Sequence, residues 1–227
     1  MTSNEILLNL LNSCKLDELK AKLEANYREE LAINQGKAKR GHNPLKCIEK
    51  MFKSGNQTDK RLVNTAHKQE NGLYAFINGY SIFTATENYG FREAEPHELL
   101  KCGNFFPKPS DLENTFEVNK KELDLFIKTK ANKPTKYDKR PYVIKTEAGV
   151  IGVNAEFLQT ALEYVQTNKI CFGHITNGSS LRSPLVVGDI TAEVVALVLP
   201  VNVSDNEVAL GYLNAWRDSY KEVLSNI

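Results

Sequence analysis

Two Asn-Gly pairs close together, Asn71-Gly72 and Asn78-Gly79, constrain the fold of this chain more than any other feature. Asn-Gly between apolar runs is typical of β-hairpin turns, because glycine adopts positive φ without steric cost. The segments that they separate, 61–67, 73–77 and 80–86, therefore predict a small antiparallel meander. Strands joined by such short turns exclude a doubly wound sheet, whose parallel strands need helical crossovers.

Segments with helical spacing of apolar residues alternate with the predicted strands. Asn43, Asn119 and Asn154 precede three of them, where an asparagine side chain can cap the helix. Helices are predicted as a pair within 3–34 and singly at 44–53, 119–130, 154–166 and 205–227. Further strands are predicted at 142–145, 150–153, 170–174, 185–187 and 194–199, with Pro200 ending the last one. The pattern predicts an α+β fold of antiparallel sheets and helices.

Composition narrows the class of protein. The chain has 227 residues and a formal net charge of +1, a length that suits one large domain or two small ones. It has no long apolar run, so no membrane span is expected. No secretory signal is visible at the N-terminus, and the four cysteines are scattered without a C-x-x-C motif. Reduced thiols and a cytoplasmic location are therefore expected.

The sequence shows no pattern typical of a catalytic or metal site. The phosphate-binding motifs G-x-x-x-x-G-K-[ST] and G-x-G-x-x-G are absent, and so is H-E-x-x-H. The four histidines lie far apart, and Cys171 sits between Ile170 and Phe172, which predicts a buried thiol. We therefore expect a protein that is not an enzyme, with no catalytic residue, no metal and no cofactor.

Lysines gather on two of the predicted helices. They could contact DNA phosphates without reading bases, or they could simply fill exposed helix faces. The near-zero net charge argues against a strongly electrostatic DNA binder unless the charges are segregated onto one surface. The candidate DNA-binding residues are Lys46, Lys50 and Lys53 on 44–53, and Lys120, Lys121, Lys128, Lys130 and Lys133 on 119–130 and the linker after it.

Several ordered motifs resemble those of bacterial DNA polymerase III sliding clamps, the β subunit. In the second half these are Val153-Asn154-Ala155-Glu156-Phe157-Leu158, Ser183-Pro184-Leu185-Val186-Val187 and Ala196-Leu197-Val198-Leu199-Pro200-Val201-Asn202-Val203, which resemble the last clamp domain. Upstream, 73–80 resembles a clamp strand, turn and strand, and 106–112 resembles the segment between clamp domains. The resemblance covers residues 43 to 203.

The resemblance implies a DNA-clamp-like fold with helices on one face of the sheets. Clamp rings encircle duplex DNA without reading its sequence and tether a polymerase, so the lysine helices would line the hole. A homo-oligomer, duplex DNA and a polymerase or other replication protein are the partners implied. In the family, client peptides bind beside the last strand, which corresponds here to Leu197, Leu199, Pro200 and Val201. The alternative for these four residues is ordinary core packing.

The chain also departs from the family pattern. Clamp chains have three domains, whereas this chain has room for two, expected at 43–112 and 113–204. The helical extension 1–42 and the C-terminal helix 205–227 have no counterpart, and the helix 154–166 carries Glu156 and Glu163 but no lysine. A closed ring would need a different number of subunits. A short clamp of this kind would suit a phage or a mobile element.

Two functional hypotheses follow. The first is a non-enzymatic clamp-like protein that encircles or associates with duplex DNA and tethers replication proteins. The second is a clamp-fold interaction module that forms no ring and binds no DNA. Its interface would use Trp216, with Tyr212 and Tyr220 beside it, because aromatic side chains often anchor protein contacts. The alternative for these aromatic residues is packing within the chain.

Overall fold

A computed structural model describes residues 42–55, 57–131, 141–146, 149–173, 184–201 and 206–226. Its helices are α3 (Pro44–Ser54), α4 (Lys120–Ala131), α5 (Ala155–Val165), α6 (Asn206–Ser219) and α7 (Lys221–Leu224). Its strands are β1 (Thr65–Lys68), β2 (Tyr74–Ile77), β3 (Ser81–Ala85), β4 (Arg92–Glu93), β5 (Leu112–Glu117), β6 (Tyr142–Thr146), β7 (Gly149–Val153), β8 (Lys169–Gly173), β9 (Leu185–Val187), β10 (Ala196–Val198) and β11 (Pro200–Val201). The helices predicted within 3–34 lie outside the described residues.

The strands form two sheets. One has eight strands in the order β4-β1-β2-β3-β10-β9-β8-β5, and the other has three in the order β11-β7-β6. Neighbouring strands are antiparallel, apart from the parallel pair of β1 and the short β4. The predicted α+β class with antiparallel sheets is therefore confirmed.

The meander β1-β2-β3 turns at the two Asn-Gly pairs, as the sequence predicts. Gly72 and Gly79 have φ values of 84° and 88°, which a residue with a Cβ adopts only with strain. The first strand begins later than predicted, at Thr65 rather than Arg61. The preceding residues form a turn in which the backbone N–H of Leu62 donates to the carbonyl of Asp59 at 2.9 Å.

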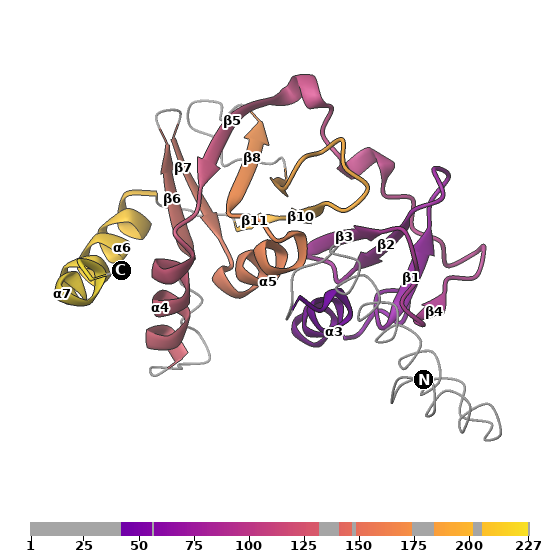
Figure 1. Ribbon diagram of the computed structural model, residues 1–227, viewed down its shortest axis with the longest axis horizontal. Helices are drawn as coiled ribbons and strands as arrows, with labels where there is room; N and C mark the ends of the chain where they lie inside the picture. The colour runs from indigo at the N-terminus through magenta and orange to yellow at the C-terminus, as the bar shows by residue number, and fades with distance from the viewer. Residues whose placement is uncertain are drawn as a thin grey trace, which may run out of the picture.

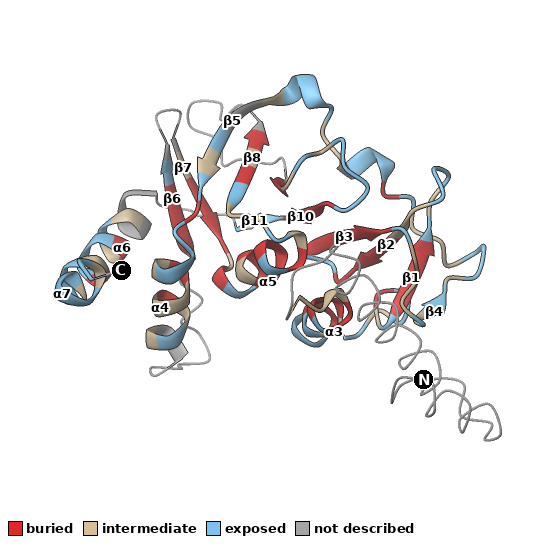
Figure 2. Ribbon diagram, in the orientation of Figure 1, coloured by how far each residue is buried: buried red, intermediate tan, exposed pale blue. Residues whose placement is uncertain are grey.

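Helices α3, α5 and α4 form a row on one face of the sheets (Figure 1), which we call the helix layer. The central helix, α5, contacts both neighbours as well as β9 and β10. Tyr164 of α5 stacks on Phe83 of β3 with ring centroids 4.6 Å apart, and its hydroxyl donates to the carbonyl of Thr84 at 2.7 Å. Buried residues line the inner sides of the helices and strands (Figure 2). The prediction of helices on one face is confirmed.

The larger sheet joins the two halves of the chain. Strand β10 pairs with β3, with Ala196 opposite Phe83 and Val198 opposite Ser81. The expected domains 43–112 and 113–204 therefore share one sheet, and their boundary falls at the first residue of β5. The division of the chain into these two domains stays a prediction.

The last segments differ from the expected pattern at two points. Pro200 does not end the strand region but begins β11, where it lies opposite Val153 of β7. Proline can occupy the first residue of a strand because it lacks only the N–H donor. The single helix expected over 205–227 is interrupted at Tyr220, so α6 and α7 are separate. None of the described helices is long and apolar enough to cross a membrane.

Candidate nucleic-acid interface

Helix α3 presents its lysines on one exposed face. The side chain of Asn43 caps the helix by accepting a hydrogen bond from the backbone N–H of Lys46 at 2.9 Å. Leu45, Ile48 and Phe52 are buried against the sheet. Helical periodicity then turns the three predicted lysines toward the surface. These residues, Lys46, Lys50 and Lys53, are all exposed.

Helix α4 begins in the same way. Oδ1 of Asn119 accepts from the backbone N–H groups of Lys121 at 3.1 Å and Glu122 at 3.2 Å. Leu123 and Phe126 are fully buried. The exposed lysines of this helix are Lys120, Lys121 and Lys128. The side chain of Lys130 and the whole of Lys133 lie outside the described part of the chain, so their predicted roles stay predictions.

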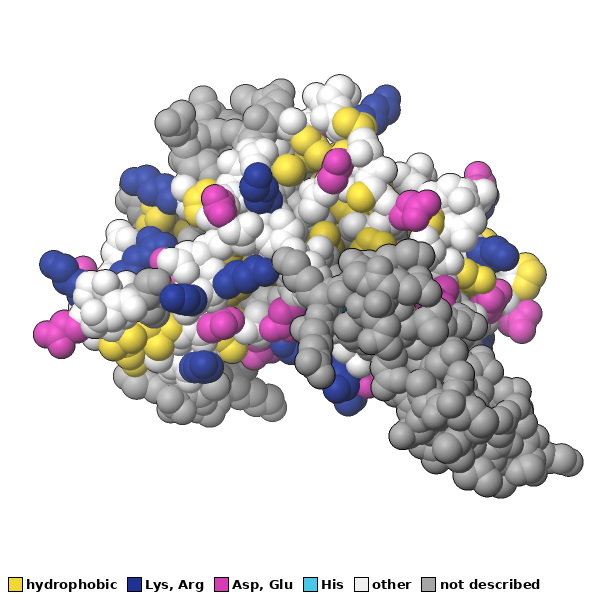
Figure 3. Space-filling model, viewed as in Figure 1, with side chains coloured by type: hydrophobic (Ala, Val, Ile, Leu, Met, Phe, Trp, Pro, Cys, Tyr) yellow, Lys and Arg dark blue, Asp and Glu magenta, His cyan; other side chains and the backbone are white. Residues whose placement is uncertain are grey.

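Helix α5 separates the two lysine faces. Its exposed carboxylates are Glu156 and Glu163, as the sequence indicated. The ammonium of Lys50 on α3 lies 3.5 Å from Oε2 of Glu163 and donates to Oε1 of Gln159 at 3.2 Å. The amide of Gln159 in turn donates to Oδ1 of Asp124 on α4 at 2.6 Å. Basic and acidic side chains therefore alternate across the helix layer, and Figure 3 shows both kinds over this part of the molecule.

The residues predicted to bind client proteins divide into buried and exposed. Leu197 is 1% exposed and belongs to the core, whereas Leu199 and Val201 are 41% and 38% exposed and Pro200 is half-buried. The sequence interpretation missed Tyr80, which is 49% exposed and stacks on Phe157 of α5 with centroids 5.5 Å apart. Its carbonyl accepts a hydrogen bond from the backbone N–H of Leu199 at 2.9 Å.

We call Tyr80, Leu199 and Val201 the apolar patch. A signal for it was present in the sequence. Tyr80 directly follows the Asn78-Gly79 turn, and segments that connect strands run over the protein surface. Its closeness to Leu199 depends on the pairing of β3 with β10, which no local pattern indicates.

The side chain of Trp216 is buried and packs against other residues of this chain. It is 8% exposed, its Nε1 donates to Oγ1 of Thr129 at 2.8 Å, and its ring meets Phe126 edge-on at 5.1 Å. Tyr212 and Tyr220 are half-buried. These contacts favour packing within the chain over the predicted role of Trp216 in binding a partner.

A cavity of about 730 Å³ lies between the loop 68–73, the irregular segment 99–109 and the loop 190–195. These segments lie across β1–β3 from α3 (Figure 1). Burial raises the pKa of the Cys102 thiol in this cavity to about 12, so the thiol stays protonated at neutral pH. Cys171, expected to be buried, is partly exposed near the edge strand β5, where its sulfur lies 3.7 Å from the hydroxyl of Thr115.

Among the described residues, no group of three or more His, Cys, Asp and Glu side chains is placed to hold a metal ion. Of the histidines that the structure describes, His67 is the buried one, and both of its ring nitrogens are engaged. Its Nε2 lies 2.9 Å from the carbonyl of Arg61, and its Nδ1 accepts from the backbone N–H of Leu100 at 3.2 Å. These bonds hold the segment around residue 100 against β1.

No family model and no curated protein matches the chain. Solved structures of sliding clamps are similar to part of it. A protein described as a DNA polymerase III beta subunit from Eubacterium rectale is 20% identical, with 59% of this chain and 42% of that chain covered and a TM-score of 0.35. The DNA polymerase III beta subunit of Thermotoga maritima is 15% identical, with 58% and 42% covered and a TM-score of 0.34.

The beta clamp of H. pylori, solved with diflunisal, is 13% identical, with 69% of this chain and 63% of that chain covered and a TM-score of 0.42. The chain thus spans less than half the length of the first two clamp proteins. These three are members of the family that the sequence motifs resemble. The likeness covers part of the fold and does not extend to the role of any residue.

Proposed function

We propose that this protein is a non-enzymatic, sliding-clamp-like factor that encircles or associates with duplex DNA and tethers replication proteins. The observation that carries the proposal is the helix layer, in which α3 and α4 each expose a set of lysines on either side of α5. The clamp-like motifs in the sequence support it, because the helices of clamps face the DNA.

Exposed lysines on helices suit contact with phosphates rather than with bases. Such contacts release counterions, give no sequence preference, and weaken steeply as the salt concentration rises. The formal net charge of +1 and the carboxylates on α5 keep this attraction modest. A protein that encircles DNA needs little intrinsic affinity, so weak binding is compatible with retention on the duplex.

Fluorescence anisotropy with two labelled duplexes of unrelated sequence tests the association with DNA. We expect the same affinity for both duplexes and a loss of affinity between 50 and 200 mM salt, as phosphate contacts require. Absence of binding at the lower salt concentration, or binding to one duplex alone, would contradict the proposal.

Ring closure is the second part of the proposal, and it requires several copies of this chain. The solution mass from light scattering tests it. A dimer or trimer whose mass does not fall on dilution supports a ring. A monomer near 25.5 kDa contradicts a self-assembled ring and favours the interaction module.

The apolar patch favours a second candidate function, a clamp-fold module that binds a replication protein without encircling DNA. Tyr80, Leu199 and Val201 are exposed apolar residues, and the backbone N–H of Leu199 donates to the Tyr80 carbonyl at 2.9 Å. Exposed apolar surface of this kind often marks a protein contact. Binding to a purified replicative polymerase tests it. Leu199→Ser should weaken binding, whereas Val194→Ser, at a residue of similar exposure outside the patch, should not.

A further inference from the structure

Lys50 is held differently from the other lysines of α3. Its ammonium faces Oε2 of Glu163 at 3.5 Å and Oε1 of Gln159 at 3.2 Å, both on the neighbouring helix α5. No such partner among the described residues is found for Lys46 or Lys53, which flank it on the same helix face. One positive charge of the lysine set is therefore directed along the protein surface.

The contacts around Lys50 extend across all three helices of the layer. The Gln159 amide directs its oxygen to Lys50 and its nitrogen to Asp124 of α4, with the second hydrogen bond 2.6 Å long. An amide between a cation and a carboxylate has one favourable orientation, because only the oxygen accepts and only the nitrogen donates. Gln159 therefore keeps Lys50 beside Glu163.

The pair of Lys50 and Glu163 lies at the surface. Each side chain is 47% exposed, and ion pairs of this kind contribute little to folding stability. Its main consequence is electrostatic, because a lysine paired with a carboxylate offers little net attraction to an anion. The pair lowers the number of lysines that the helix layer can offer to phosphates.

We infer that Glu163 limits the affinity of this protein for duplex DNA by holding Lys50 away from the phosphates. The inference rests on the proposed association with DNA and names the residue that regulates it. Glu163 thus acts through Lys50 and contacts no DNA itself.

The expected effect is measurable because one phosphate contact changes the salt dependence by a known amount. Each contact adds about 0.9 to the steepness of log K against log salt, which is a loss of roughly threefold in affinity between 50 and 200 mM salt. Glu163→Gln removes the carboxylate charge and should free Lys50 to make one such contact.

Glu156 provides a matched control. It lies two turns before Glu163 on α5, is exposed, and forms no ion pair with another described residue. Glu156→Gln therefore makes the same change in net charge on the same helix without releasing a lysine. Thermal unfolding of each variant establishes that it is folded before binding is compared.

The experiment measures duplex binding by anisotropy between 50 and 200 mM salt for both variants, alone and combined with Lys50→Gln. We expect E163Q to bind more tightly than E156Q, with a slope steeper by about 0.9, and to lose this advantage when Lys50 is replaced. Equal affinities of E163Q and E156Q, with salt-dependent binding of the wild type, would overturn the inference and leave the proposed function standing. Absence of binding by every protein at 50 mM salt would overturn both.

Discussion

Trp216 donates a hydrogen bond from Nε1 to Oγ1 of Thr129 across 2.8 Å, and this bond joins α6 to α4. The Trp216 ring also meets Phe126 edge-on, and Leu213, one turn earlier on α6, is 1% exposed. The C-terminal segment is therefore packed into the same core as the helix layer.

Replacing Thr129 with valine should loosen α6. Valine keeps the shape of threonine but leaves the indole N–H of Trp216 without an acceptor, which costs about 1–3 kcal/mol. Urea unfolding followed by the emission of Trp216, the only tryptophan in the chain, measures the loss. Thr129→Ser keeps the hydroxyl, so it should keep most of the stability that Thr129→Val loses. Equal stabilities of Thr129→Val and the wild type would contradict the role of the hydrogen bond.

A second link between α6 and α4 is charged. Arg217 donates from Nε and Nη2 to Oε1 of Glu122 at 3.0 and 2.7 Å, and the hydroxyl of Tyr142 donates to the same oxygen at 3.2 Å. The Glu122 side chain is 15% exposed. Hydrogen bonds to a charged group contribute about 1.5–3 kcal/mol, so Glu122→Gln should lower the free energy of unfolding by roughly 1–2 kcal/mol.

The pair of Lys101 and Glu70 is the matched control, because its side chains are 74% and 87% exposed. Glu70→Gln should change the free energy of unfolding by less than about 0.5 kcal/mol, as is usual for surface ion pairs. Chemical denaturation of both variants gives the comparison. A loss for Glu70→Gln as large as that for Glu122→Gln would show that the partly buried pair has no special role.

His67 should make stability depend on pH. Burial, with smaller contributions from the positive charges of Arg92 and Arg61, lowers its pKa from the ordinary value of 6.5, although Glu98 and the Arg61 carbonyl oppose this shift. Since Nδ1 accepts from Leu100 and the Arg61 carbonyl can only accept, the neutral ring carries its proton on Nε2. Protonation of Nδ1 would break the bond to Leu100.

The sign of this pH dependence follows from the linkage between the protonation of His67 and folding. Because the folded pKa lies below the unfolded one, the contribution of His67 is fully present above about pH 6.5 and is lost as the pH falls through the folded pKa. One such group changes stability by at most about 1.4 kcal/mol per pH unit. Urea unfolding at pH 7.5 and 5.5 should show a smaller loss for His67→Gln than for the wild type.

The exposed His97 serves as the control, and His97→Gln should behave as the wild type does. Burial also lowers the pKa of His42, so part of the loss should remain when His67 is replaced. The same pH dependence in the wild type and in His67→Gln would contradict the assignment.

Local features of the fold could be predicted from the sequence, and pairings between distant segments could not. The caps at Asn43 and Asn154 and the turn at Asn78 depend on neighbouring residues, and all three were predicted. Asn78 also donates its amide to the carbonyl of Met51 at 2.9 Å, a contact that depends on how α3 packs on the meander. The edge strand β5 was missed because its sequence, LENTFE, has few apolar residues to indicate a strand.

In the candidate site, too, local features could be predicted from the sequence and contacts between distant segments could not. Helical spacing was enough to place the lysines of α3 and α4 on exposed faces. The pairing of Lys50 with Glu163, and of Tyr80 with Leu199, joins residues more than a hundred positions apart, so it follows only from the packed structure. The proximity of the C-terminal helix to α4 was likewise beyond a local pattern.

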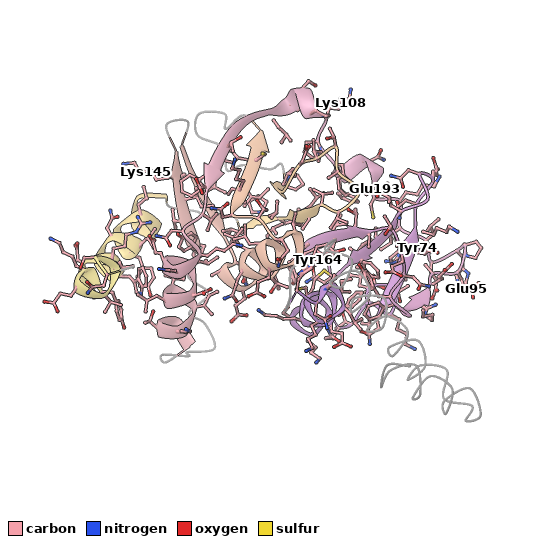
Figure 4. All side chains as sticks on the ribbon, viewed as in Figure 1. Tyr74, Glu95, Lys108, Lys145, Tyr164 and Glu193 are labelled. Atoms are coloured by element: carbon pink, nitrogen blue, oxygen red, sulfur yellow. The ribbon has the colours of Figure 1, made fainter. Side chains whose placement is uncertain are left out.

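The central claim is that the helix layer is the surface that meets duplex DNA. The most direct test compares two double variants of equal charge, Lys53→Gln with Lys128→Gln on the layer, and Lys108→Gln with Lys145→Gln away from it (Figure 4). In anisotropy titrations against salt, the first pair should lower the slope by about 1.8, the value for two phosphate contacts, and the second should leave it unchanged. Equal slopes for the two double variants would contradict the claim.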